Sequence, residues 1–403
     1  MRPFTSTIPF QDALRIVVEH AAPIEGTERL TLAEADGRVA AATVTASVNV
    51  PPFDRAAMDG YAVIAADTET ANAATPVALR CVDRVFTGQV SARTLARGEC
   101  IEIATGAPLP NGADAVVMVE DTERAGNDLA IHVRASVPPR QHVGRRGADL
   151  SPGQAIVQTG DLLTPSRIGA LAATGLTHVE VFRRPSIAIL STGNELAEPG
   201  QPLGPGQIYE VNRCTLAAVV ARHGGVAVML PTAGDTIEEL SRAVETAKAH
   251  DVIIFSGGSS VGERDLVLDI VQQHGDVIFH GIAVKPGKPT LFGRIGDTPV
   301  LGMPGNPTSC LSNAYMLLVP FLRRMARLPD WQPKTITLPL ARAITSAPGR
   351  HQFYTVRVVD GRAEPAFKGS GEITSMANAD GYFEIESDVT EVPAGTSVTV
   401  KLF

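Results

Sequence analysis

The sequence predicts a multidomain α/β plus β protein: a doubly wound α/β domain, an inserted β domain, an N-terminal helical segment and a small C-terminal β-barrel domain. The first reason is length, because 403 residues exceed the ~250–300 that one hydrophobic core usually organises. The second is an alternation of apolar runs and helical stretches over residues 186–325, typical of right-handed βαβ crossovers and a mostly parallel sheet covered on both faces. The third is the short β-rich runs, separated by Gly, Pro and Asn, on either side of that alternation.

The N-terminal part is expected to begin with helices. Residues 9–20 place Ala13 and Val17 at helical spacing between charged side chains, and a second helical piece is predicted over residues 32–42. From residue 44 to 137 the chain changes to short β-rich runs, so we predict an inserted β domain there. Its clearest predicted strands cover residues 77–82, 115–119 and 129–133.

A predicted helix over residues 165–174 leads into the α/β part. The strands expected there cover residues 186–190, 226–230 and 252–255, with others near Val277 and Val300; the helices cover residues 209–223, 237–250, 265–274 and 307–325. After residue 328 strands are predicted again, over residues 335–340, 352–359, 382–386 and 397–403. The predicted domains are therefore 1–44 with 138–177 (helical and linking), 45–137 (inserted β), 178–328 (α/β) and 329–403 (C-terminal β).

Composition limits the classes of function. Hydrophobic residues make up 44% and charged residues 19% of the chain, enough for ordinary cores, and a net charge of -8 offers no general basic field for nucleic acid. The four cysteines form no Cys-x-x-Cys pair, which argues against a zinc ribbon or a dense disulfide framework. There is no apolar signal core and no run of ~18 apolar residues. We expect a cytoplasmic protein that binds neither nucleic acid nor membrane, so that any bound anion must be held by local groups.

Three apolar runs of the α/β part each end in a polar turn that carries one acid. These acids are Glu195, Asp235 and Asp265, and the turn 302–307 follows another apolar run. In a parallel sheet all of these turns meet at the carboxyl edge, where open α/β sheets bind ligands. The alternation therefore predicts a shared pocket.

Carboxylates that converge in one pocket repel each other and any phosphate unless a cation lies between them. Oxygen ligands without a His or Cys cluster favour Mg²⁺ over zinc, so we infer a magnesium-bridged anion. Each acid also has a simpler interpretation. Asp265 could cap the following helix, while Asp235 and Glu195 could be solvated loop residues.

Two glycine-rich turns offer groups for an anion. Gly257, Gly258 and Gly262 allow close approach of backbone N–H donors, although any tight turn needs such glycines. In the turn 285–289, prolines stiffen the chain around two lysines, whose alternative is to be solvated surface residues. This turn is not a Walker A motif, because Pro289 stands where the magnesium-binding Ser or Thr would be. Metalloprotease, α/β-hydrolase and dinucleotide-binding motifs are also missing from the sequence.

Several linked motifs occur in order along essentially the whole chain: Pro52-Phe53-Asp54, Met58-Asp59-Gly60-Tyr61-Ala62, Thr105-Gly106-Ala107-Pro108, Ser191-Thr192-Gly193-Asn194-Glu195-Leu196, residues 256–265, residues 285–289 and Pro304-Gly305-Asn306-Pro307. Together they resemble the MoeA family, molybdopterin molybdenumtransferases, which is related to the E domain of gephyrin. The resemblance implies a homodimer of four-domain subunits whose α/β domain is similar to the molybdopterin-binding fold of MogA and MoaB. The implied reaction takes adenylylated molybdopterin and molybdate, inserts molybdenum at the dithiolene and releases AMP with the help of Mg²⁺. A MogA-type adenylyltransferase and molybdoenzyme-maturation proteins are the expected partners.

The resemblance also implies roles for individual residues. The acidic, metal-linked and catalytic group would be Asp59, Glu195, Asp235 and Asp265, with Asp149 as a further candidate. Substrate would be bound by Thr105, Gly257, Gly258, Ser259, Ser260, Lys285, Lys288, Pro304, Asn306, Pro307, Arg350 and Ser370. Because Asp59 belongs to a different predicted domain, it is expected to reach the site across the dimer.

Two positions depart from the family pattern. Ala56 stands where a Ser is common, and Gly281 stands where a basic residue is common, so the grip on molybdate is expected to differ; His280 is a possible substitute. Two alternative functions stay open: adenylylation of molybdopterin by the same α/β fold, and a gephyrin-like scaffold role.

Overall fold

A computed structural model describes residues 7–124, 129–234, 236–257 and 265–403 of the protein. The chain forms two compact units, one made of residues 1–28 with 182–403 and the other of residues 29–181. Each unit has hydrophobic clusters of its own. Among the described residues, no helix has the length and apolar character needed to cross a membrane.

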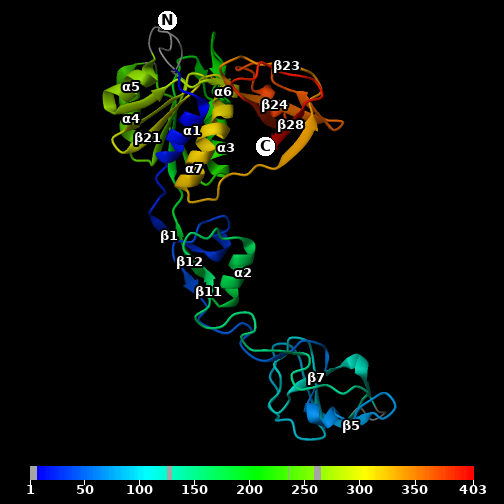
Figure 1. Cartoon of the computed structure of the whole chain (residues 1–403). Helices are drawn as coiled ribbons and strands as arrows, with labels where there is room; N and C mark the ends of the chain where they lie inside the picture. Colours follow the sequence, from blue (N-terminus) through cyan, green and yellow to red (C-terminus); the bar gives the residue numbers. More distant parts are fainter. Residues whose placement is uncertain (1–6, 125–128, 235, 258–264) are drawn as a thin grey trace. The chain divides into compact units, whose positions relative to one another are not determined.

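The first unit contains a six-stranded sheet in the order β16-β13-β17-β21-β20-β18 (Figure 1). The first four strands are parallel, with Ile189 paired to Met229 on one side and to Ile254 on the other. Strand β20 runs antiparallel to both of its neighbours. The strands are β13 (Ser186–Ser191), β16 (Val226–Met229), β17 (Val252–Ser256), β18 (Asp276–His280), β20 (Leu291–Ile295) and β21 (Thr298–Met303). The predicted mostly parallel sheet is confirmed, with β20 as an antiparallel strand that the prediction omits.

Both faces of this sheet are covered, because successive residues of its central strands are buried and most of them are apolar. Ile189 and Ile254 join a core with helices on one face, whereas Leu190 and Phe255 join a second core on the other face. The first face packs against α1 (Phe10–Glu19), α3 (Asn212–Arg222), α6 (Pro307–Asn313) and α7 (Val319–Met325), and the second against α4 (Ile237–Ala247) and α5 (Leu266–His274). Figure 1 shows α1, α3 and α7 side by side.

Local signals explain where these helices begin. Thr236 caps α4 by accepting the N–H of Glu239 at 3.2 Å, and Asp265 caps α5 in the same way. The predicted helix 307–325 is present as α6, a π-helical turn (Ala314–Leu318) and α7. The turn precedes Pro320, which has no N–H to continue the hydrogen-bond ladder. The predicted helix 209–223 begins later, at Asn212, and two short strands, β14 (Leu196–Ala197) and β15 (Ile208–Tyr209), lie before it.

The predicted C-terminal β domain is confirmed in the same unit. Its main sheet has the order β19-β24-β26-β28-β22, with β25 added to β24. The first strand of this sheet belongs to the α/β part of the chain, so Lys285 lies in the sheet of the C-terminal domain. The elements are β19 (Val284–Lys285), β22 (Thr335–Pro339), β23 (Ile344–Thr345), β24 (His351–Val359), β25 (Arg362–Pro365), α8 (Thr374–Ala377), β26 (Gly381–Ile385), β27 (Glu391–Val392) and β28 (Ser397–Leu402).

The second unit contains the predicted inserted β domain, whose sheet has the order β7-β4-β6-β5-β9-β8. These strands are β4 (Gly60–Val63), β5 (Val77–Val85), β6 (Glu99–Ile103), β7 (Ala115–Met118), β8 (Thr122–Arg124) and β9 (Ala130–Val133). Shorter elements complete the unit: β2 (Val44–Thr45), β3 (Arg55–Ala56), β10 (Val143–Gly144), β11 (Ala155–Val157), α2 (Pro165–Ala173), and β1 (Thr27–Thr31) and β12 (His178–Phe182) at its ends.

The predicted helix over residues 32–42 is wrong. Only Leu32–Glu34 form a single 3₁₀ turn. Gly37 adopts a positive φ of 69°, which ends any helix, and Val39 forms a β-bridge with Leu162. The helix therefore ends after a single 3₁₀ turn, and the chain continues into the β-bridge between Val39 and Leu162.

Candidate active site

Three turns at the carboxyl edge of the α/β sheet lie in direct contact. A Cβ added to Gly257, after β17, would lie 2.7 Å from the carbonyl oxygen of Thr192, after β13. A Cβ added to Gly305, after β21, would lie 3.4 Å from the Gly257 Cα. Glycine is needed at Gly257 for a second reason, because its φ is 90°. The predicted meeting of these turns is therefore observed.

Glu195 follows β13 in this cluster of turns. Its carboxylate lies over Gly193, where an added Cβ would be 2.6 Å from Glu195 Oε2, and its side chain is exposed. The backbone that carries it is anchored, since the Glu195 carbonyl accepts the N–H of Ile208 at 2.8 Å. Buried Glu210 holds the same loop by accepting the Ser191 hydroxyl at 3.1 Å. Glu195 is thus presented to solvent from a fixed backbone.

Asp265 has a structural task in addition to its predicted role. Its Oδ1 accepts the N–H of Leu268 at 3.0 Å, so Asp265 caps α5, as the simpler interpretation of the sequence predicted. Its other oxygen, Oδ2, lies 3.1 Å from His280 Nε2, at ion-pair distance but without the alignment of a hydrogen bond. One carboxylate therefore connects the start of α5 to the end of β18.

The Gly281 departure has a conformational explanation. Gly281 has a φ of 98°, in the region that glycine adopts far more easily than a basic residue does. The imidazole of the neighbouring His280 is directed at Asp265. Ala56, the other departure, is buried at 1% exposure in β3, where its N–H donates to the Ala107 carbonyl.

The lysine turn is held from behind by a buried amide. Asn313 Nδ2 in α6 donates to the Gly287 carbonyl at 2.9 Å, and the Thr290 hydroxyl donates to the same oxygen at 2.8 Å. Gly287 has a φ of 106°, and an added Cβ would lie 2.4 Å from the Asn313 amide. Lys285 is exposed at one end of this turn and Lys288 is half-buried within it.

Two predicted residues of the C-terminal domain lie against the α/β part. Ser370 accepts a hydrogen bond from Asn306 Nδ2 at 3.2 Å, directly after the turn at Gly305. Arg350 is exposed and immediately precedes β24, whose first residue donates its N–H to the carbonyl of Ala283 at 2.9 Å. Pro304 is buried and Pro307 is the first residue of α6. The structure thus brings Ser370 to the turn after β21 and Arg350 to strand β19.

In the second unit, Asp59 and Thr105 form a pair of their own. The Asp59 carboxylate accepts the Thr105 backbone N–H at 2.7 Å and its hydroxyl at 2.9 Å. These two hydrogen bonds, the backbone one first, hold the pKa of Asp59 below its usual value. Both side chains are exposed, as is Asp149 in the same unit. Asp59 is therefore a fixed, ionised carboxylate.

The described acids fit Mg²⁺ only in an open arrangement. Within the residues that the structure describes, no group of three or more His, Cys, Asp or Glu side chains is placed to hold a metal ion. Mg²⁺, however, is commonly held by one or two carboxylates, with water and substrate phosphate as the remaining ligands. Glu195 and Asp265, both oxygen donors at the same sheet edge, suit that arrangement. Of the other predicted residues, Asp235, Gly258, Ser259 and Ser260 lie outside the described residues.

The buried residues that shape this site were not predicted from the sequence. Asn212 donates from Nδ2 to the Gly305 carbonyl at 2.7 Å, and Asn313 supports the lysine turn. Asn313 is fully buried at the end of α6, directly before the apolar run 314–319. A buried amide needs a hydrogen-bond partner, so an asparagine directly before the apolar run 314–319 was the signal that could have identified it.

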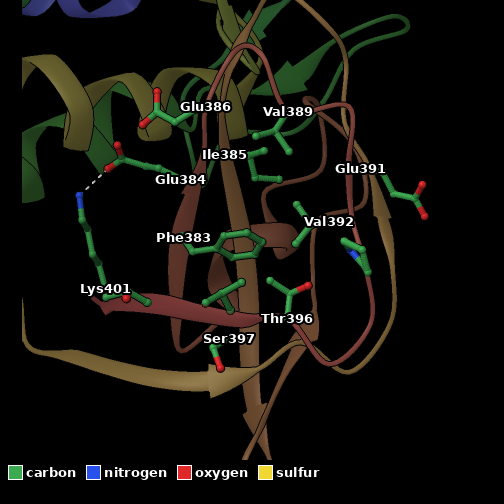
Figure 2. A pocket seen from close by; sticks show the side chains of 13 residues that line it. Phe383, Glu384, Ile385, Glu386, Val389, Glu391, Val392, Thr396, Ser397 and Lys401 are labelled. Atoms are coloured by element: carbon green, nitrogen blue, oxygen red, sulfur yellow. Dashed lines mark hydrogen bonds and ion pairs between the residues drawn. The ribbon is translucent and has the colours of Figure 1, made fainter.

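A separate cavity of about 510 Å³ lies in the C-terminal domain (Figure 2). Its floor includes Phe383 and Ile385 of β26, and Lys401 forms an ion pair with Glu384 at its side. None of the predicted site residues lines it. The candidate site is therefore the sheet edge and not this cavity.

The fold and the site together define a class: a multidomain protein with a doubly wound α/β domain whose strand-end turns meet at one edge of the sheet. Comparison with known families narrows this class. Residues 8–175 match the MoeA N-terminal region (domain I and II), residues 188–324 a probable molybdopterin binding domain, and residues 337–403 the MoeA C-terminal region (domain IV). This chain belongs to the MoeA family.

Individual relatives agree with that assignment. The chain is 37% identical to molybdopterin molybdenumtransferase 2 of Mycobacterium tuberculosis over 381 residues, 92% of this chain and 93% of that protein. It is 32% identical to the molybdopterin molybdenumtransferase of Haemophilus influenzae, with 94% of each chain covered. The crystal structure of a molybdopterin biosynthesis MoeA protein from Pyrococcus horikosii matches with a TM-score of 0.84 and 38% identity, over 98% of this chain and 99% of that one.

Proposed function

We propose that this protein is a molybdopterin molybdenumtransferase of molybdenum cofactor biosynthesis. Its substrates are adenylylated molybdopterin and molybdate, and its products are molybdenum-loaded molybdopterin and AMP. Family membership supports the reaction class, because the relatives that cover most of the chain carry this name. The observation that carries the proposal is the contact between the turns after β13, β17 and β21 at the carboxyl edge of the α/β sheet.

The cations on and beside strand β19 suit a phosphate-bearing substrate. Lys285 is exposed on strand β19, and Arg350 precedes the strand paired with it, so both cations lie on the same part of the fold. We assign to Lys285, Arg350 and Lys288 the binding of phosphate and molybdate oxygens. The stiff turn around Gly287 keeps the lysines oriented, since its carbonyl is bound by Asn313 and Thr290.

Glu195 and Asp265 are the residues that would hold Mg²⁺. The ion, when bound, supplies positive charge between these carboxylates and the substrate's phosphate oxygens. His280 lies beside Asp265, with its Nε2 3.1 Å from Asp265 Oδ2, so this imidazole borders the proposed site. Asp235 belongs to the same proposed acidic group.

We further propose a homodimer in which Asp59 of one subunit serves the site of the other. The support is the resemblance of the chain to MoeA proteins and the fixed, ionised state of Asp59, which Thr105 maintains. A MogA-type adenylyltransferase would supply the substrate, and molybdoenzyme-maturation proteins would receive the product.

The direct test is reconstitution. Purified protein is incubated with adenylylated molybdopterin, molybdate and Mg²⁺, and AMP release and cofactor formation are followed with a known transferase as positive control. Formation of both products is the expected result. Absence of product while the control works would contradict the proposal and favour a scaffold. Conversion of free molybdopterin and ATP to the adenylate would instead favour an adenylyltransferase.

A further inference from the structure

Two cysteines of the inserted β domain face each other across neighbouring strands. Cys81 in β5 and Cys100 in β6 are register partners in a parallel pair. Paired strands lie about 4.7–4.9 Å apart, which falls inside the range of about 4.4–6.8 Å that separates the Cα atoms of disulfides. Both side chains belong to the same hydrophobic cluster, so they lie on one face of the sheet, and both are free thiols. We propose that Cys81 and Cys100 form a reversible dithiol–disulfide pair that small-molecule disulfides oxidise.

The surroundings of the two thiols assign them different tasks. Cys81 is partly exposed, whereas Cys100 is fully buried, so an oxidant in solution reaches Cys81 first. A hydrogen bond from Cys100 lowers the pKa of Cys81 to about 6, although burial opposes this, and the same contact raises the pKa of Cys100. The charges of Glu102 and Arg124 act on Cys81 in opposite directions: the Glu102 carboxylate raises its pKa and the Arg124 guanidinium lowers it. A partly exposed thiol in such a setting is the reactive kind.

The backbone at Cys81 has room to adjust. The register between β5 and β6 shifts directly after this residue, where Asp83 and not Val82 pairs with Ile101. Such a β-bulge adds a residue to one strand and bends it locally. In the reduced protein Cys81 Sγ lies 3.5 Å from the Asp83 carbonyl oxygen, within the same bulge. The bulge therefore interrupts the regular ladder next to Cys81, where the bond to Cys100 would form.

The reaction is two successive thiol–disulfide exchanges with a small disulfide RSSR. The Cys81 thiolate attacks one sulfur, forms a Cys81–S–S–R mixed disulfide and releases RS⁻. Cys100 then loses its proton to water and attacks the Cys81 sulfur, which forms the Cys81–Cys100 bond and releases a second RS⁻. The two cysteines lose two electrons and RSSR gains them, giving two RSH after protonation.

The test uses the full-length reduced protein and glutathione disulfide as the oxidant. After a timed incubation the remaining thiols are alkylated under denaturing conditions and counted by mass spectrometry, with peptide mapping of the cross-link. We expect the loss of the Cys81 and Cys100 thiols, a linked Cys81–Cys100 peptide, and full recovery of both thiols with dithiothreitol, whereas exposed Cys214 can only gain a glutathione adduct. A Cys214→Ser variant, which removes an exposed thiol elsewhere, should give the same cross-link.

Single variants test the order of events. Cys100→Ala should stop at a stable mixed disulfide on Cys81, while Cys81→Ala should leave Cys100 unmodified; far-UV circular dichroism checks that each variant is folded. If wild-type protein accumulates only the mixed disulfide, or if Cys100 is modified in the Cys81→Ala variant, the proposal is wrong. Should Cys100→Ala fail to fold, the linked peptide from wild type decides alone.

The pH profile of the first step gives an independent readout. A thiol that ionises near pH 6 reacts at a rate that levels off above about pH 7, whereas an ordinary thiol, with a pKa of about 8.5, still gains about tenfold between pH 7 and 8.5. The rate at pH 7 itself is less informative, because a more acidic thiolate is also a weaker nucleophile. A profile for Cys81 that rises like that of free glutathione would contradict the assigned order of attack.

Discussion

Asp265 has two separable properties, a capping oxygen and a charge. Its Oδ1 caps α5 and its Oδ2 faces His280. Asparagine caps helices about as well as aspartate, so Asp265→Asn removes the charge and keeps the cap. We expect a loss of Mg²⁺-dependent turnover of about 10²-fold or more, because such charge stabilisation is worth several kcal/mol, with a melting temperature close to that of wild type.

The matched control for this prediction is Asp297→Asn. Asp297 is an exposed aspartate in the hairpin between β20 and β21, at the opposite end of β21 from the site. Its substitution should leave turnover unchanged. Near-normal turnover in Asp265→Asn would remove this residue from the proposed site.

Glu384 predicts a specific acid sensitivity of the folded state. Burial would raise its pKa, but hydrogen bonds from His351 and Lys401 lower it to about 2. A carboxylate with a depressed pKa stabilises the fold above its unfolded pKa of about 4.5, and this contribution is lost as the pH falls through the folded value. The total is ~3 kcal/mol, of which about 2 should be lost between pH 6 and pH 3.

Urea unfolding of wild type and Glu384→Gln at several pH values measures this term. The variant should be less stable at pH 6, and its free energy of unfolding should fall less steeply between pH 5 and pH 3. Glu391→Gln, an exposed acid at the same cavity, should follow the wild-type slope. Identical slopes for all three proteins would show that Glu384 is not the responsible group.

At the residue scale, the sequence predicted the site residues that directly follow a strand along the chain. Glu195 and Asp265 could be placed because each follows an apolar strand, and parallel strands end together. Asn313 and Asn212 could not, because their partners, the carbonyls of Gly287 and Gly305, are distant in sequence and only the packing of helices against turns brings them near. The sequence indicated that Asp265 could cap the following helix, and it does. The contact of Asp265 with His280 was not predicted.

At the scale of elements, the turn with the two lysines depends on a glycine in contact with a helix. Gly287→Ala would combine an unfavourable φ with a Cβ placed 2.4 Å from Asn313. We expect about 1–3 kcal/mol of lost stability and a raised KM for the adenylylated substrate, because the lysines move with the turn. Chemical denaturation and steady-state kinetics measure the two effects.

Gly296→Ala is the matched control. Gly296 also has a positive φ, of 59°, but nothing lies within 4 Å of the position of its Cβ. It should therefore show only the cost of backbone strain, ~1 kcal/mol, and an unchanged KM. Equal KM values for the two variants would argue against a role of the lysine turn in binding substrate.

Periodicity predicted most helices and strands of the α/β part because each amphipathic or apolar run has one dominant period. It failed at residues 32–42, where helical spacing of Leu32 and Ala35 was outweighed by Gly37 and by pairing with Leu162 and Val181. It also omitted β20, whose Gly293 and Arg294 interrupt the apolar pattern. The packing of α1 against α7 and the π-helical turn joins residues about 300 positions apart, which no local pattern encodes.

At the scale of the whole molecule, the proposed exchange of Asp59 between subunits predicts complementation. The protein should have about twice the monomer mass of 42.4 kDa in solution. Asp59→Asn and Asp265→Asn homodimers should each be nearly inactive. When the two variants are co-expressed, mixed dimers should regain one working site, because one subunit supplies an intact Asp59 to the intact Asp265 of the other.

Differently tagged variants allow the mixed dimers to be isolated and assayed for AMP release. About half of the wild-type turnover per dimer is expected. No recovery in mixed dimers, with correct assembly shown by light scattering, would mean that Asp59 and Asp265 act within one subunit or that Asp59 is not part of the site.

Strand β19 has a consequence for how this protein can be shortened or recombined. Lys285 lies in a sheet whose other strands come from residues beyond 334. Ser370 is hydrogen-bonded to Asn306, in the turn before α6. A truncation after residue 328 would leave that lysine without its neighbouring strand. The α/β domain and the C-terminal β domain are therefore coupled through β19. Replacing the C-terminal domain by that of a relative should succeed only when β19 is exchanged with it.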